Sequence, residues 1–194
     1  MNTYLIYDPA INGAYTQLIL QQQYPVHRSL FAGTKDEGLD DVAPFLFQTD
    51  ELFAQKVMYQ QLIELKAVVF LKAEGSLEAV ATHFRPFIYQ TLKGREYFFR
   101  FWDARVLAKF LPTCDKEQIK TFFEDLESLT IADESNAAQD ICYRHDHGRL
   151  LISSVPSATV SGAQPVAVQV DKTGPGKSED TGSTEAKKRR TFLS

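Results

Sequence analysis

The sequence predicts a mixed α/β (α+β) domain, with a central mixed β-sheet flanked by helices and a flexible C-terminal tail. Three observations support this fold class. Along residues 1–152, short strand-like apolar segments alternate with segments whose apolar residues recur at helical spacing. The 194 residues are 44% hydrophobic, which is enough for a core of ordinary size. Residues 153–194 contain one aromatic residue, Phe192, and consist largely of small, polar and basic residues, as expected of a disordered segment.

The charges divide the chain at the same place. Residues 1–152 carry 15 of the 21 basic and 21 of the 25 acidic residues, a net charge of −6, whereas residues 153–194 have a net charge of +2. We therefore expect a globular domain over 1–152 and a low-complexity, disordered tail over 153–194. Within this tail, Pro165 to Val170 could add an edge strand or pair with a partner's sheet.

Composition also limits the class of protein. The acidic balance argues against a nucleic-acid partner, and the apolar runs are too short to cross a membrane. No signal peptide precedes the first strand, and two cysteines, Cys114 and Cys142, form no disulfide framework. We expect a cytoplasmic protein.

The elements of the first half follow from local patterns. Thr3 to Tyr7 is an apolar run closed by Asp8 and Pro9, typical of a strand and a turn. Asn12 is expected to cap a helix that turns Tyr15, Leu18 and Ile19 inward. The other expected elements are strands at Val26–Phe31, Phe45–Phe47 and Ala67–Lys72, a loop at Gly33–Gly38 and a helix from Asp50 to about Leu65.

The second half has clearer helix signals. Ser76 is expected to cap a helix with an apolar stripe from Leu77 to Ile88, which Pro86 should kink or end. Asp103 should cap a second helix that ends at Pro112. An aromatic strand is expected at Tyr97–Trp102. A capping box of Asp115 and Gln118 is expected to open a helix whose inward residues are Ile119, Phe122, Phe123 and Leu126. A hairpin of Ile141–Tyr143 and Leu150–Ser153 is expected around His147 and Gly148.

Two motifs in the tail have simpler explanations than the functions they suggest. Gly174 to Ser178 resembles the end of a phosphate-binding loop, but Asp171 stands where that loop needs glycine. The residues that follow have no apolar helical face. The basic run Lys187 to Arg190 is interpreted as solvated charge rather than a nucleic-acid patch. We expect no nucleotide cofactor.

Metal binding and nucleophilic catalysis have little support. Cys142, His145, Asp146 and His147 are close in sequence, and on a strand the two histidines would share a face. A structural zinc site needs four ligands, so an exposed polar turn is the better interpretation. Cys114 follows a helix-ending proline and is interpreted as a packing residue. We therefore expect no metal, no cofactor and no catalytic residues.

The densest feature is the segment from Thr82 to Leu107. On a strand, Phe98, Arg100 and Trp102 would share one face and Tyr97, Phe99 and Phe101 the other. Arg100 then needs a partner, and Asp103 could accept from it or from the first helical N–H groups. Arg105 also needs an acidic or carbonyl partner. One interpretation is a buried, ion-paired corner between strand and helix. The other is a charged ledge for a protein partner, built from His83, Arg85, Arg100 and Arg105.

These residues resemble the signature of a bacterial family encoded beside type VI secretion effectors, first catalogued as a domain of unknown function. In that family an aromatic strand runs into Arg-Phe-Tyr-Asp-Pro-Arg-Val-Leu, and the counterpart here is Arg100 to Leu107. Trp102 replaces the tyrosine and Ala104 the proline. The likeness covers about residues 4–130, and its other counterparts are Tyr4–Asp8, Gly33–Thr34, Pro44–Leu46, His83–Arg85 and Gln118–Phe123.

The resemblance implies a cytoplasmic effector chaperone or adaptor without enzymatic activity. Such a protein binds a cognate type VI effector and helps load it onto the VgrG spike or its tip protein. The candidate protein-binding or corner residues, taken from the two interpretations of the Thr82–Leu107 segment, are His83, Arg85, Arg100, Trp102, Asp103 and Arg105. The alternative is a small toxin-type hydrolase or nuclease that is itself the effector and depends on Cys114 or His83.

Overall fold

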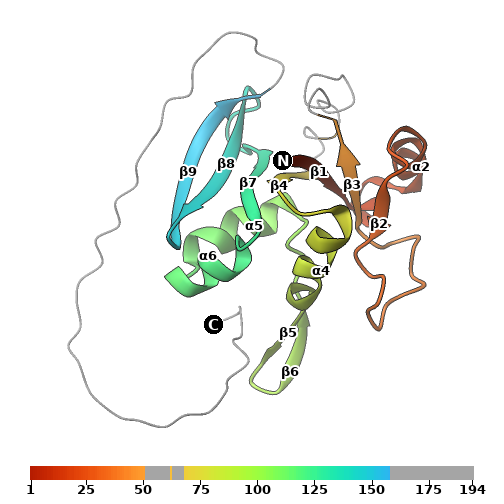
Figure 1. Cartoon of the computed structure of the whole chain (residues 1–194), viewed down its shortest axis with the longest axis horizontal. Helices are drawn as coiled ribbons and strands as arrows, with labels where there is room; N and C mark the ends of the chain where they lie inside the picture. The colour runs from red at the N-terminus through yellow and green to blue at the C-terminus, as the bar shows by residue number, and fades with distance from the viewer. Residues whose placement is uncertain (51–61, 63–67, 158–194) are drawn as a thin grey trace, which may run out of the picture.

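The computed structural model describes residues 1–50, 62 and 68–157. It confirms the mixed α/β class (Figure 1). The described residues form a seven-stranded sheet and a separate two-stranded hairpin, and every strand pair in both is antiparallel. The strands are β1 (Asn2–Tyr7), β2 (His27–Ser29), β3 (Phe45–Thr49), β4 (Val68–Ala73), β5 (Tyr89–Leu92), β6 (Arg95–Phe98), β7 (Leu126–Ala132), β8 (Gln139–Asp146) and β9 (Arg149–Pro156).

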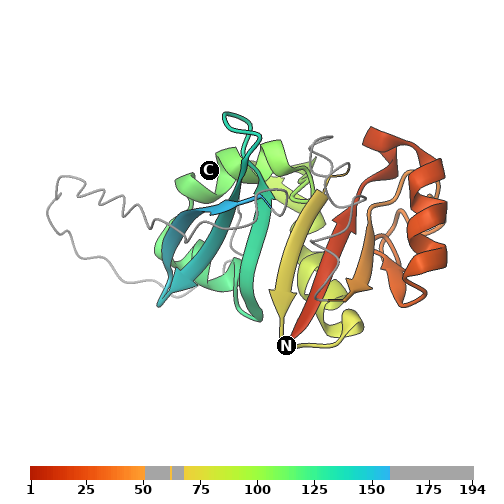
Figure 2. The same ribbon diagram turned by 90° about the horizontal axis from the view of Figure 1, so that it is seen from above.

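The large sheet has the order β2-β3-β1-β4-β7-β8-β9, so the first strand of the chain lies inside the sheet. Figure 2 shows these strands side by side, with the first helices beyond the β2 end. The side chains of Tyr4 to Tyr7 are all 0% exposed, which means that β1 is covered on both faces. This explains why its sequence is a continuous apolar run rather than an alternating one.

Five α-helices lie in the described residues, and their ends match local capping signals. They are α1 (Pro9–Asn12), α2 (Ala14–Gln23), α4 (Leu77–Ile88), α5 (Ala104–Phe110) and α6 (Lys116–Phe122), with a 3₁₀ turn η2 (Leu111–Thr113) after α5. The predicted caps Ser76, Asp103 and Asp115 are confirmed, including the capping box with Gln118. Pro86 lies inside α4, which continues for only two residues beyond it.

Aromatic rings join the helices to one another and to the segment before α5. Phe84 of α4 stacks on Phe101, with ring centroids 4.7 Å apart. Phe122 of α6 meets Phe84 at 6.0 Å and Phe110 of α5 at 6.2 Å. A single core therefore includes α4, α5 and α6, which lie together against the sheet in Figure 1.

The prediction for the first long helix was wrong in its cap and its buried face. Helix α2 begins at Ala14, after Gly13 with φ 81°, rather than after a cap at Asn12. Tyr15 is 77% and Leu18 56% exposed, while Gln17 and Leu20 are buried. The buried residues are thus i and i+3 on the opposite face from the one predicted.

The predicted aromatic strand at Tyr97–Trp102 ends early, at Phe98. The N–H of Phe99 donates to the carbonyl of Ile88 at 2.8 Å, and the chain then turns, with Asp103 N–H donating to the Arg100 carbonyl at 3.0 Å. Phe99, Phe101 and Trp102 are therefore all buried instead of alternating between two faces. Their shared burial in the core favours the turn over an extended strand.

The C-terminal strands were predicted only in part. The hairpin around His147 and Gly148 is confirmed, but β8 and β9 are longer than expected and β7 was missed. Strand β9 runs to Pro156, beyond the expected domain end at residue 152. The helix expected at Asp50–Leu65 and the motifs of the tail lie outside the described residues, apart from Asp50 and Leu62.

Candidate functional site

Asp8 is the centre of the candidate site. It directly follows β1, caps α1 by accepting the N–H of Ala10 at 2.8 Å, and is 1% exposed. Its Oδ2 accepts a hydrogen bond from Arg100 Nη2 at 2.6 Å and another from Trp102 Nε1 at 2.9 Å. The carboxylate thus connects the end of β1, an interior strand of the sheet, to the segment before α5.

This arrangement corrects the expected partner of Arg100, since Asp103 receives its side-chain bonds from Arg105 instead. Arg105 Nε and Nη2 donate to the two oxygens of Asp103 at 2.9 and 2.7 Å, and the Arg105 N–H donates to Oδ1 at 3.0 Å. Burial by itself raises the pKa of Asp103, but the hydrogen bonds and charge of Arg105, with a smaller effect of Arg100, outweigh it and lower that pKa. The predicted N-cap and the predicted acidic partner of Arg105 are both confirmed.

Both arginine side chains of this corner are partly exposed, although the carboxylates that bind their guanidinium groups are buried. The side chains of Arg100 and Arg105 are 39% and 51% exposed, whereas those of Asp8 and Asp103 are 2% and 6% exposed. The buried carboxylates therefore fix two guanidinium groups at the surface. We call the group of Asp8, Arg100, Trp102, Asp103 and Arg105 the arginine corner.

Trp102 fixes the corner to the core. Its indole is 1% exposed and makes edge contacts with Phe31 at 6.1 Å, Phe98 at 5.4 Å and Phe101 at 5.0 Å. Because the ring is packed on several sides, its N–H has a fixed direction toward Asp8. Trp102 thus combines a buried aromatic ring with a polar donor at this position.

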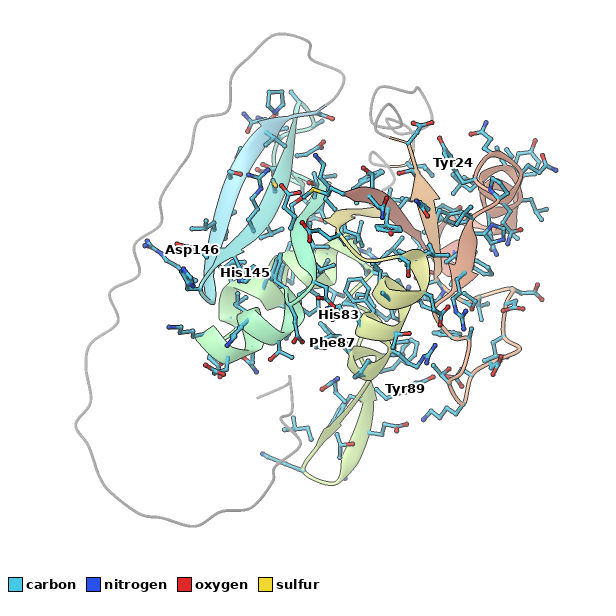
Figure 3. The ribbon with its side chains drawn as sticks, in the orientation of Figure 1. Tyr24, His83, Phe87, Tyr89, His145 and Asp146 are labelled. Carbon is cyan, nitrogen blue, oxygen red and sulfur yellow. The ribbon has the colours of Figure 1, made fainter. Side chains whose placement is uncertain are left out.

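The other two members of the predicted ledge lie away from these pairs. His83 points from α4 toward α6, where its Nε2 lies 3.0 Å from the carbonyl oxygen of Phe122 (Figure 3). Arg85 packs over Gly33, whose φ is +74° and whose added Cβ would lie 3.2 Å from the Arg85 Cζ. The structure thus brings Arg100, Trp102, Asp103 and Arg105 into one corner but gives His83 and Arg85 separate packing roles.

Sequence reasoning missed Asp8 as a site residue. One available signal was its position in the sequence. Asp8 directly follows an apolar strand and precedes Pro9, so it must lie at the edge of the core. A carboxylate there needs charged or N–H partners, as buried charges generally do. The partner could not be identified, because Arg100 lies 92 residues further along the chain.

The residues considered for catalysis and metal binding have packing or turn positions in the structure. The Cys114 thiol lies 3.5 Å from the Phe110 carbonyl oxygen, and burial, with a smaller effect of Asp115, raises its pKa to about 12. His145 stacks on Phe123 at 5.6 Å, while His147 lies in the turn with φ 48° and an almost fully exposed side chain. Within the part of the chain that the structure describes, no three His, Cys, Asp or Glu residues are grouped as metal ligands.

An exposed aromatic pair lies next to the corner. The β5–β6 hairpin extends away from the sheet below α4 in Figure 1, and its Tyr97 and Phe98 are 42% and 46% exposed. Tyr97 and Phe98 are consecutive on β6, so their side chains point to opposite faces of the hairpin. Phe98 is on the face that packs edge-on against the buried Trp102 of the arginine corner. At the base of the hairpin, Tyr89 (labelled in Figure 3) donates a hydrogen bond to Asp36.

The fold and the site define a class: an antiparallel α+β domain with paired arginines at the junction of its first strand and α5. The chain belongs to the family described as "Domain of unknown function (DUF4123)", which matches residues 3–121. No curated protein and no solved structure matches the chain. The matched range runs from β1 to α6 and includes the whole arginine corner, whereas β7, β8 and β9 follow it.

Among the residues that the structure describes, no helix has both the length and the apolar composition to span a bilayer.

Proposed function

We propose that this protein is a cytoplasmic chaperone or adaptor that binds a type VI secretion effector and helps load it onto the VgrG spike or its tip protein. The observation that carries the proposal is the arginine corner, which lies in the matched family range and is built from the segment that resembles the effector-chaperone signature. The proposed activity is binding, without catalysis or a cofactor.

The geometry of the corner suits recognition of a protein. Ordering a free arginine side chain at an interface costs about 0.5–1.5 kcal/mol, and Arg100 and Arg105 are already held by buried carboxylates. The neighbouring Phe98, which packs against Trp102, adds exposed aromatic area, and aromatic residues are enriched at protein interfaces. A partner surface with acidic groups beside apolar side chains would complement this region.

The environment of Cys114 is unfavourable for the alternative, a toxin-type hydrolase. A nucleophilic cysteine needs a lowered pKa, but that of Cys114 is raised to about 12. The His83 Nε2 is directed at the main-chain carbonyl of Phe122. These two observations favour a packing role for both residues.

Co-expression with the products of the neighbouring effector and spike genes tests the proposal. We expect a stoichiometric complex with the effector, measured by size-exclusion chromatography with light scattering. Arg105→Ala should weaken binding by about 10-fold, as for an arginine hot spot, while Arg144→Ala, at an exposed position of β8, should change it less than twofold.

Two results would overturn the proposal. One is the absence of a complex with every neighbouring toxin and spike product. The other is growth arrest when the protein is expressed alone, abolished by Cys114→Ala or His83→Ala, which would identify the chain as the toxin itself.

A further inference from the structure

A small cavity lies between α5 and the start of the β7–β8 connection. It has a volume of about 160 Å³, and its apolar lining comes from Ala104 and Ala108 of α5 and from Ala132 and Ile141 of the sheet. The cavity is partly open to the surface. A cavity of about 150 Å³ with an apolar lining can hold a benzene-sized group. The space therefore fits one apolar side chain between Leu and Phe in size.

The rim of the cavity has an excess of negative charge. Asp133 and Glu134 contribute two carboxylates against one basic lining residue, Arg105, which bonds both oxygens of Asp103 and also interacts electrostatically with Glu134. Asp133 Oδ1 accepts from the N–H and hydroxyl of Ser135, which fixes the carboxylate at the rim. If a partner places an apolar side chain in the cavity, the neighbouring residue of that partner meets an acidic surface. Such a surface favours a basic residue at that position.

The two walls of the cavity have different origins. The α5 wall lies within the matched family range of residues 3–121, while Ala132, Asp133, Glu134 and Ile141 lie after it. Arg105 belongs both to the arginine corner and to this cavity. The cavity thus shares Arg105 with the surface proposed to bind the effector, but five of its eight lining residues come from the part of the chain outside the family match.

We propose that this cavity is the specificity pocket for the effector: it takes one apolar side chain of the effector that has a Lys or Arg beside it. This inference rests on the proposed function. The apolar side chain supplies affinity by leaving water, and the acidic rim selects sequences in which a basic residue is adjacent. The arginine corner, in contrast, recognises acidic groups, so the two sites together set the orientation of the effector.

Filling the cavity tests the first half of the proposal. Ala108→Leu places a side chain in the space and should weaken effector binding by about 10-fold or more, as for loss of a central interface contact. Ala79→Leu introduces the same change at an exposed position of α4 and should alter binding less than twofold. Thermal unfolding of both variants shows whether the fold is kept.

Reversing the rim charge tests the second half. Glu134→Lys should slow association with the effector by about fivefold at low salt and less at high salt, because long-range attraction is screened. Glu124→Lys makes the same charge change at an exposed position after α6 and should leave the rate within twofold.

Methyl NMR of the full chain gives a readout that needs no variant. With labelled Ala and Ile methyl groups, adding unlabelled effector should shift the signals of Ala104, Ala108, Ala132 and Ile141 and give contacts to an effector side chain. A complex that forms without shifting these methyl groups, or that binds Ala108→Leu as tightly as the wild type, would refute the pocket and leave the proposed function standing.

Other occupants would also overturn the pocket. Contacts from these methyl groups to residues 158–194 in the free protein would show that the chain fills its own cavity. Concentration-dependent shifts without the effector would identify a second copy as the occupant. Absence of any effector complex would refute the proposed function itself and this inference with it.

Discussion

Replacing Asp8 by alanine tests whether the arginine corner stabilises the fold. The carboxylate is 1% exposed and accepts hydrogen bonds from Arg100, Trp102 and the N–H of Ala10. All three bonds are lost together in Asp8→Ala, whereas no large apolar side chain is removed. The measured effect therefore reports on the polar junction rather than on core packing.

The expected loss can be estimated from the three bonds. Removing a helix cap costs about 0.5–2 kcal/mol, and leaving a buried indole N–H without an acceptor costs about 1–3 kcal/mol. Arg100 is 39% exposed, so water replaces much of its ion pair and we give it little weight. We expect the free energy of unfolding to fall by about 3 kcal/mol, near the middle of the combined cost of the cap and the indole N–H. This corresponds to a decrease in Tm of about 6–12 °C.

Urea denaturation followed by circular dichroism and by fluorescence measures this change. Trp102 is the only tryptophan of the chain, so the fluorescence comes from the corner itself. Asp8→Asn keeps an oxygen for the α1 cap and should lose less stability, and Asp40→Ala in an exposed loop should change it by less than about 0.5 kcal/mol. A value for Asp8→Ala within about 1 kcal/mol of the wild type would refute the structural role of the corner.

Three further predictions concern a turn, a thiol and a carboxylate. Gly148→Ala should destabilise the fold by about 2 kcal/mol more than Gly94→Ala in urea denaturation. Both glycines have positive φ, but an added Cβ meets the carbonyl oxygen of Lys116 at 2.6 Å only at Gly148, and equal losses would contradict this contact. Cys114, with its pKa raised to about 12, is almost entirely protonated at pH 8 and should react with iodoacetamide far more slowly than in urea-unfolded protein; equal rates would refute its burial. The pKa of Asp103 is lowered in the fold, so its contribution to stability is present above the unfolded value of 3.8 and lost as pH falls through the folded pKa. Asp103→Asn should therefore flatten the acid side of the stability curve, and an unchanged curve would contradict the pairing.

Features that depend on neighbouring residues were predictable from the sequence. The caps at Ser76, Asp103 and Asp115 each act within three residues, and all three form as expected. The apolar stripe of α4 also fixed its buried face, since Val80, Ala81 and Phe84 are in the core. In these places local chemistry and tertiary packing favour the same structure.

Features that depend on distant residues were not predictable. The run Tyr97–Trp102 has the composition of a strand, but the core takes in Phe99, Phe101 and Trp102 together and ends the strand. The partner of Arg100 follows from the placement of β1 beside the segment before α5, which no local pattern encodes. In α2 the side chains of Tyr15 and Leu18 are apolar but exposed. Side-chain polarity alone therefore predicted the wrong face of this helix to be buried.

The interior position of β1 in the sheet has a consequence for synthesis of the chain. Its two neighbours in the sheet are β3 and β4, and β4 ends at Ala73. Roughly 65 residues must be added after β1 before its second edge can pair, which takes about 3–13 s at about 5–20 residues per second. During this time the apolar run Tyr4 to Tyr7 is without its final partners. A ribosome-associated factor that covers this segment should therefore increase the yield of folded protein, and slower elongation before residue 73 should decrease it.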